Sequence, residues 1–313
     1  MIWRSGCSSA SCSPRTIPTR PRNPFPVVTV WRSVSVTVNN PRQSLSAADR
    51  VVTSVRDQVA YVTLNRPDKY NGVDFAMLRG LVAAAKRIEK DRDIRAVLLQ
   101  GSGSAFCAGL DFSVFREESS LSQLRAAGKW PGKRTNLFQQ AIWVWRTLPV
   151  PVIAVVDGYC YGAGFQLALA ADFRYTTPDC EFSIMEGKYG LIPDMTGSVT
   201  LRELVPMDIA KRLTMTAEVF DGRAAKEYGL VTEVSDEPLA DAEAFTAQLL
   251  TRSPDGLAAA KRLFHDTWTR PPRRAFWTET VLQLRLITGA NHKIARKAAA
   301  SKDQPRWRRR SLR

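Results

Sequence analysis

Histidine is scarce in this chain of 313 residues, which holds only His265 and His292. This scarcity rules out most catalytic triads that use histidine as the base. No cluster of His and Cys has the spacing of a metal site. The five cysteines, at positions 7, 12, 107, 160 and 180, are odd in number and show no paired spacing. Free thiols in a reducing compartment fit this pattern better than disulfides do. We therefore expect a cytoplasmic protein without a bound metal.

Long apolar runs are also missing. No stretch approaches the roughly 18 consecutive apolar residues of a membrane-spanning helix, so we expect no membrane span. Nucleotide fingerprints are absent as well. No Gly-x-Gly-x-x-Gly opens a helix after the first predicted strand, and the turn GAGFQL lacks the Lys-Ser/Thr pair of a phosphate loop. These absences exclude the two commonest kinds of nucleotide site.

Positive charge is plentiful but concentrated at the two ends of the chain. Of the net charge of +15, eleven charges come from arginines in residues 1–48 and 305–313, where no acid occurs. The part between them is nearly neutral, so it does not present the basic face of a nucleic-acid-binding protein. We therefore do not expect nucleic acid as a partner. One alternative stays open, in which the Arg-rich ends bind RNA with a steep salt dependence.

The composition changes along the chain and suggests its organisation. Residues 1–50 are rich in Ser, Pro and Arg, and we interpret them as a basic extension that is disordered, a targeting leader or upstream of the true start. Within it, 27–38 alternates like a strand but has no evident partner. We predict a core domain at 51–237, a helical region at 238–302 and a basic tail at 303–313.

Strand-like and helix-like patterns alternate from residue 51 onward. Strands are predicted at 58–65, 95–101, 150–158, 173–177 and 230–236, and helices at 74–91, 136–148 and 162–172. Asp74 has the position of an N-cap. Residues 238–302 read as helix, with breaks at Pro254, Pro271–Pro272 and Gly289. This order predicts an α/β fold in which helices cover a mostly parallel sheet.

Two glycine-centred turns follow buried strands. They are GSGSAFCAGLD at 101–111 and DGYCYGAGFQLALAAD at 157–172. Turns at strand ends place backbone N–H groups at the mouth of a sheet, and the second turn also opens a helix, whose first N–H groups are unpaired. Two such donors could hold an oxyanion. Alternatively, the glycines only permit tight packing and left-handed backbone.

Four segments together point to a family. LNRPDKYNGVD, GSGSAFCAGLD, VIAVVDGYCYGAGFQLALAADFRYTT and FSIMEGKYGLIP, in this order, resemble the enoyl-CoA hydratase/isomerase (crotonase) superfamily over about 51–302. The resemblance implies a spiral of ββα units with a C-terminal helical region, and a homo-oligomer, either a trimer or a dimer of trimers. It also implies an acyl-CoA thioester substrate, whose coenzyme A is part of the substrate, with no other cofactor bound.

The resemblance also carries residue roles. The backbone N–H groups of Leu110 and Ala163 match the two donors that hold the thioester oxygen. Lys69 lies in the segment that matches the family's CoA-contacting loop, and it could meet a phosphate of the carrier or lie free in solvent.

Three side chains match, or depart from, the family's catalytic positions. Glu186 matches the second glutamate of the hydratases, but Gln166 stands where they carry the first. Asp194 falls where the dienoyl-CoA isomerases carry an aspartate. We therefore expect double-bond isomerisation by Glu186 and Asp194, since an amide cannot transfer protons as a carboxylate does. Hydration, with Gln166 helping to hold the water, and an inactive CoA-ester binder are the alternatives. In a purely structural alternative, Asp194 caps the helix near Thr196 and Glu186 faces solvent.

Overall fold

The computed structural model describes residues 47–111, 113, 126–129, 132–301 and 303–312. The predicted extension at 1–50, with its strand-like stretch at 27–38, therefore lies outside the described residues except for α1 (Ala47–Arg50). The chain divides after Gln43 into two units. The second unit, Ser44–Arg313, contains all the described residues.

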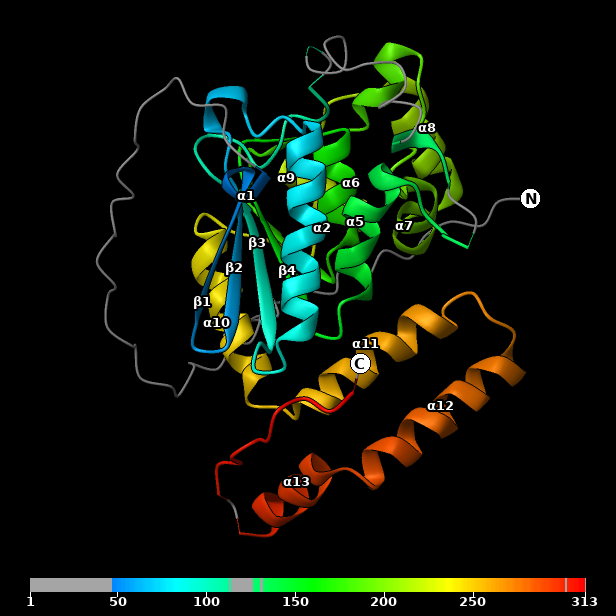
Figure 1. Ribbon diagram of the computed structural model, residues 1–313. Coiled ribbons are helices and arrows are strands. Elements are labelled where there is room, and N and C mark those ends of the chain that lie inside the picture. Colours follow the sequence, from blue (N-terminus) through cyan, green and yellow to red (C-terminus); the bar gives the residue numbers. More distant parts are fainter. Residues whose placement is uncertain (1–46, 112, 114–125, 130–131, 302, 313) are drawn as a thin grey trace, which may run out of the picture. The chain divides into compact units, whose positions relative to one another are not determined.

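The centre of the fold is a six-stranded sheet in the order β1-β2-β3-β4-β6-β8 (Figure 1). Its strands are β1 (Val51–Arg56), β2 (Val59–Leu64), β3 (Ala96–Gly101), β4 (Val152–Val156), β6 (Phe173–Thr176) and β8 (Glu233–Val234). Only β1 is antiparallel to its neighbour. A second, two-stranded parallel sheet pairs β5 (Tyr159–Tyr161) with β7 (Glu181–Ser183). The predicted α/β class, with a mostly parallel sheet, is confirmed.

The central strands are buried on both faces, which explains their continuous apolar sequences. In β3, Val97 and Leu99 join the large core under α2 (Phe75–Lys90) and α5 (Leu137–Thr147). Ala96 and Leu98 point the other way and pack under α10 (Pro238–Leu250). Figure 1 shows α2 and α10 on opposite sides of these strands. The period of two along a strand thus gives each face its own core.

Several helix ends were readable in the sequence. The side chain of Asp74 accepts a hydrogen bond from the Met77 amide at 2.7 Å, which confirms it as the N-cap of α2. Asn136 and Gln139 form a capping box at the start of α5. The predicted breaks in the C-terminal region separate α11 (Pro254–Thr267), α12 (Pro272–Ile287) and α13 (Ala290–Ser301).

Shorter elements connect these layers. The remaining helices are α6 (Ala163–Ala170), α7 (Gly197–Leu204), α8 (Met207–Thr216) and α9 (Gly222–Glu227), with 3-10 turns η1 (Pro67–Lys69) and η2 (Met185–Tyr189). No helix in the described part of the chain is long and apolar enough to span a membrane. Three short strands were not predicted. β5 and β7 have three residues each, and β1 is an edge strand that buries only its first residue, so its sequence lacks a strand's alternation.

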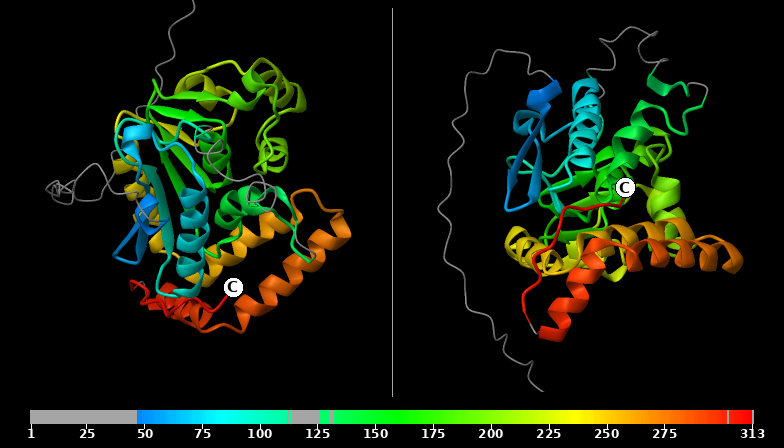
Figure 2. Two further views of the ribbon diagram at one scale, coloured as in Figure 1. Left: turned by 45° about the horizontal axis from the view of Figure 1, so that its top comes forward. Right: turned by 60° about the horizontal axis from the view of Figure 1, so that its bottom comes forward.

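The C-terminal tail returns from α13 to the body of the fold (Figure 2). Asp255, in the first turn of α11, accepts hydrogen bonds from the backbone amides of Ser311 and Leu312 at 2.6 and 3.0 Å. Arg310 is buried, and its guanidinium donates to the carbonyl of Glu89 in α2. One arginine of the basic tail therefore has a structural role that its composition did not indicate.

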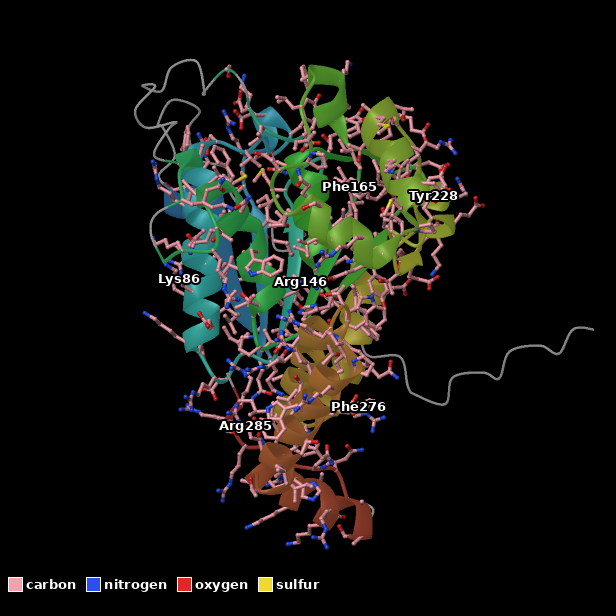
Figure 3. The ribbon with its side chains drawn as sticks, turned by 90° about the vertical axis from the view of Figure 1, so that its right-hand side faces the viewer. Lys86, Arg146, Phe165, Tyr228, Phe276 and Arg285 are labelled. Atoms are coloured by element: carbon pink, nitrogen blue, oxygen red, sulfur yellow. The ribbon has the colours of Figure 1, made fainter. Side chains whose placement is uncertain are left out.

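A buried polar cluster joins α11 to the core. The Lys261 ammonium lies 2.7 Å from Oδ2 of Asp172. The other oxygen of this carboxylate, Oδ1, lies 3.6 Å from Nε2 of His265. Arg146, labelled in Figure 3 near the junction with the C-terminal helices, pairs with Glu203. Burial, and then the charges of Arg146 and Lys261, lower the pKa of His265 to about 3. His265 is therefore neutral in the folded protein near neutral pH.

We expect His265→Gln to flatten the dependence of stability on pH. Between the unfolded pKa of about 6.5 and the lowered folded pKa, the unfolded chain binds the extra proton, so lowering the pH through this window destabilises the fold. From pH 7 to pH 5 the parent should lose about 2 kcal/mol more free energy of unfolding than the variant. Urea unfolding at both pH values measures this difference. Equal losses in the two proteins would contradict the prediction.

Candidate active site

The two glycine-centred turns lie directly against each other. The Cys107 amide donates to the Tyr159 carbonyl, and the Tyr161 amide donates to the Cys107 carbonyl, both at 2.9 Å. At the start of α6 the chains come closer still, because a Cβ on Gly164 would lie 2.4 Å from the Cys107 carbonyl oxygen. Only glycine fits there. The glycines therefore do permit tight packing, and that packing brings two sets of N–H groups together.

Within the described residues, the N–H groups of Leu110 and Ala163 have no backbone partner. The Ala108 amide donates to the Tyr70 carbonyl and the Asp111 amide donates to the Val73 carbonyl. These backbone hydrogen bonds flank Leu110 in the sequence but do not include its amide. Ala163 is the first residue of α6, where N–H groups have no partner within the helix. An ideal Cβ on the intervening Gly109 would lie 4.0 Å from the Ala163 nitrogen, which shows how near the two turns are.

Both residues line one cavity of about 420 Å³. Its walls are mostly apolar, and its polar side chains include two carboxylates and an amide. The lining residues are Ala108, Gly109, Leu110, Ala127, Asn136, Phe138, Gly162, Ala163, Met185, Glu186, Tyr189, Leu191, Ile192 and Asp194. A mostly apolar pocket with a few converging polar groups is typical of a small-molecule site.

Glu186 stands at the start of η2 with its two carboxylate oxygens in different environments. Oε1 accepts a hydrogen bond from Nε2 of Gln166 at 2.7 Å. Oε2 is buried and has no hydrogen-bond partner among the described residues. Burial raises the pKa of Glu186, and the charge of Asp194 adds to this, although hydrogen bonds from its own backbone and from Gln166 act in the opposite direction. A free, buried oxygen on a carboxylate with raised pKa is suited to proton transfer.

The side-chain oxygen of Gln166 is also held by hydrogen bonds. Its Oε1 accepts from the amides of Met195 and Gly197, both at 2.9 Å. Because those two donors fix the oxygen, the NH₂ group must face Glu186. The same contacts satisfy the start of α7, whose N-cap Thr196 makes no side-chain cap bond. The alternative in which Asp194 caps this helix is therefore wrong, as is the one in which Glu186 faces solvent, since its Oε2 is buried.

The other two predicted side chains differ in position. Asp194 lines the cavity, and partial burial raises its pKa, but the residue as a whole is exposed, so it lies at the mouth of the cavity. Lys69 is exposed at the end of η1 and is not among the lining residues. The structure thus brings five of the six predicted site residues together and leaves Lys69 outside.

Part of the cavity wall was not predicted. Asn136, Phe138 and Tyr189 line it from the start of α5 and from η2. The helix predicted at 136–148 indicated about where α5 begins, but nothing in the sequence indicated that this helix end faces the site. The buried thiols are not nucleophiles, because burial raises the pKa of Cys107 to about 12. Among the described residues, no group of three or more His, Cys, Asp or Glu is placed to hold a metal ion.

The α/β fold thus brings two residues with unpaired backbone N–H groups and a carboxylate to one mostly apolar cavity, an arrangement typical of enzymes that stabilise an oxyanion and move protons. Residues 54–310 match the family model described as enoyl-CoA hydratase/isomerase, and the chain belongs to this family. The crotonase-like fold that we expected is confirmed. An enoyl-CoA hydratase structure from Polaromonas sp. JS666 has a TM-score of 0.75 at 28% identity, over 82% of this chain and 99% of that one.

Curated relatives include enzymes of both reaction types. A (E)-benzylidenesuccinyl-CoA hydratase from Thauera aromatica is 30% identical over 215 residues, which cover 68% of this chain and 80% of that protein. A mitochondrial Delta(3,5)-Delta(2,4)-dienoyl-CoA isomerase from Mus musculus is 33% identical over 217 residues, covering 67% of this chain and 66% of that protein. Acyl-CoA chemistry is common to them, whereas the reaction differs.

We expect the pH profile of kcat/KM to have an acid limb whose midpoint lies above the usual glutamate pKa of about 4.5, because burial raises the pKa of Glu186. Activity should rise with pH through this limb, since the carboxylate form is the base. Steady-state assays from pH 4 to pH 8 measure it.

Glu186→Gln should lower turnover by at least about a hundredfold. Full turnover in that variant, on every thioester that the parent accepts, would remove Glu186 from the mechanism.

Proposed function

We propose that this protein isomerises the double bonds of an unsaturated acyl-CoA thioester, with a dienoyl-CoA as the favoured substrate. One observation carries the proposal. Gln166 occupies one oxygen of Glu186 and leaves the other free and buried, on a residue that lines the same cavity as Leu110 and Ala163. The site thus offers one strong base, and the second carboxylate, Asp194, stands elsewhere in the same cavity.

The reaction follows from this arrangement. Oε2 of Glu186 takes a proton from the carbon that is α or γ to the thioester, and the electron pair moves onto the carbonyl oxygen. The amides of Leu110 and Ala163 stabilise the resulting enolate, which is where negative charge develops. When the carbonyl re-forms, a carboxylic acid returns a proton to a different carbon of the conjugated chain. We assign this delivery to Asp194, whose pKa burial raises, and the cycle closes when Glu186 releases its proton to solvent and the partly exposed Asp194 takes one up. No water is added and no mass changes.

Hydration is the competing reaction, and several relatives carry hydratase names. It requires a water molecule to be held and activated beside the double bond. The oxygen of Gln166 already accepts two backbone N–H groups and one N–H of its NH₂ is bonded to Glu186, so only a single N–H donor of this residue is left for a water. We therefore place isomerisation ahead of hydration, and an inactive CoA-ester binder behind both.

The test is the mass and chromophore of the product. The full-length protein is incubated with a 2-enoyl-CoA and, separately, with a 3,5-dienoyl-CoA. The proposal predicts unchanged mass and a shifted ultraviolet chromophore on the dienoyl substrate. A gain of one water on the enoyl substrate, without isomerisation of the other, would establish a hydratase instead. No change in either, with binding of both esters by calorimetry, would establish a binder.

We expect Gln166→Glu to introduce hydration. A glutamate can keep one oxygen on the amides of Met195 and Gly197 and turn the other toward Glu186, which creates two carboxylates around one water site. Their repulsion should also raise the pKa of the pair. The variant should form hydroxyacyl-CoA from a 2-enoyl-CoA at least about tenfold faster than the parent, as quantified by mass spectrometry. Gln166→Met, which supplies no carboxylate, is the control and should show no gain.

We further propose that the protein acts as a homo-oligomer, a trimer or dimer of trimers, in the cytoplasm. The support is an exposed apolar stripe on α12, with Phe276 62%, Trp277 71%, Leu284 58% and Ile287 46% exposed. Phe276 is labelled on the flank of the C-terminal helices in Figure 3. Exposed apolar patches of this kind mark association sites. The reduced thiols of Cys107, Cys160 and Cys180 fit the compartment.

Trp277→Glu should therefore convert the assembly to a smaller species, because it places a charge within the stripe at its most exposed residue. Sedimentation velocity measures the change. Gln248→Glu, an exposed position on α10, adds the same charge elsewhere and should leave the assembly intact. If both variants sediment like the parent, α12 is not the interface.

A further inference from the structure

The turn that carries the Leu110 amide is held by a buried ion pair that the proposed reaction does not use. We propose that Arg66 and Asp111 are positioning residues, which together fix the direction of the Leu110 N–H group. The inference rests on the proposed function, because it concerns the same oxyanion site. Neither side chain is among the residues lining the cavity.

The geometry of the turn leads to this pair. Residues 109–111 lie beside the loop that follows β2, where the Val73 amide donates to the Gly109 carbonyl at 2.8 Å and the Asp111 amide donates to the Val73 carbonyl at 3.0 Å. Leu110 sits between these two bonds, so its N–H direction depends on how the loop and the turn are held together. These two backbone bonds alone would still allow the turn to pivot against the loop.

Arg66 braces both segments at once. Its Nη1 donates to the Gly72 carbonyl at 2.9 Å and lies 2.7 Å from Oδ2 of Asp111. One guanidinium nitrogen thus links the loop, just before Val73, to the turn, just after Leu110. A planar guanidinium presents its donors in a fixed arrangement, so it resists the shift that backbone bonds permit. The side chains of Arg66 and Asp111 are only 8% and 15% exposed, where water screens their attraction little.

The loop itself is held in a conformation that needs such support. Tyr70 and Asn71 have left-handed φ values of 47° and 56°, which cost free energy in residues other than glycine. The fully buried Asn71 stabilises this shape: its Oδ1 accepts from the Arg66 amide at 2.8 Å, and its Nδ2 donates to the carbonyls of Ser102 and Ala105. Strain maintained next to the site agrees with a positioning role.

The charge of Asp111 is also maintained. Burial would raise the pKa of its carboxyl group, but hydrogen bonds from Ser113 and then the hydrogen bond and charge of Arg66 outweigh burial and hold this pKa below its usual value. Asp111 therefore stays ionised at neutral pH, and the brace stays formed. The Arg66 guanidinium also lies 3.9 Å from Asp74, which is paired more closely with Arg50 at 2.8 Å.

Arg50 supplies the matched control. It belongs to the same buried charge cluster and pairs with Asp74, but no contact joins it to the 109–111 turn within the described residues. Arg50→Met and Arg66→Met each remove one guanidinium from the cluster. Both should lower thermal stability, whereas only Arg66→Met should disturb the Leu110 amide. Asp111→Asn removes the partner's charge with little change in shape, and it decides the question if Arg66→Met fails to fold.

The experiment reads the oxyanion site directly. The probe is 4-(dimethylamino)cinnamoyl-CoA, a conjugated thioester whose absorption moves to longer wavelength when its carbonyl oxygen accepts hydrogen bonds. Binding is followed separately by calorimetry. In Arg66→Met and Asp111→Asn the bound probe should lose most of the red shift seen with the parent, and kcat should fall about tenfold to a hundredfold with little change in KM. Arg50→Met should keep the parent's red shift.

The outcomes separate the two levels of the proposal. If the parent shifts the probe and both Arg66→Met and Asp111→Asn shift it equally, the ion pair is merely structural and the inference is overturned. An equal loss of red shift in Arg50→Met would also overturn it, because the effect would then be general. If the parent binds the probe without any red shift, the proposed oxyanion site itself is wrong, and the inference fails with it.

Discussion

The contact between Gly164 and the Cys107 carbonyl is the constraint on which the site depends. A side chain at Gly164 would have to occupy space already filled by backbone, at 2.4 Å. With glycine there, the first turn of α6 lies against the end of the turn after β3, and two N–H groups from segments more than 50 residues apart reach one cavity. The parallel sheet makes this approach geometrically natural, because the carboxyl ends of adjacent strands β3 and β4 meet at one edge.

Gln166 links the packing of α6 to the position of Glu186. Since it lies on the same short helix as Gly164, its position is fixed by the same close contact, and its amide joins η2 to the start of α7. A neutral amide does this without adding charge. A carboxylate in its place would add a second negative group against a buried one, at a cost that grows as water is excluded. The glutamine therefore leaves Glu186 as the more deeply buried of the two acids among the lining residues.

The sequence predicted what depends on local pattern. Asp74 as an N-cap, the apolar runs of β3 and β4, and the glycine turns could be recognised because each is encoded within a few residues. The contacts that define the chemistry are not local. The bonds from Met195 and Gly197 to Gln166 span 29 and 31 positions, and the bond from Ser311 to Asp255 spans 56. No periodicity encodes such pairings. The sequence therefore could not predict that Gln166 bonds the start of α7, or that the C-terminal tail bonds Asp255.

The two oxygens of Glu186 bear on the geometry of the proposed reaction. Oε1 is tied to Gln166, and Gln166 is tied to the backbone, so the carboxylate cannot rotate to exchange its oxygens without breaking the bond to Gln166 and leaving a buried donor unpaired. Proton transfer by this residue is then confined to Oε2 and to the one face of the acyl chain that Oε2 meets. A second transfer at a distant carbon must come either from the same oxygen, after the proton has been carried along that face, or from Asp194. This confinement is the physical basis of our proposal of isomerisation, because an isomerase needs one base and a reachable acid, whereas a hydratase also needs a free hydrogen-bonding group for its water.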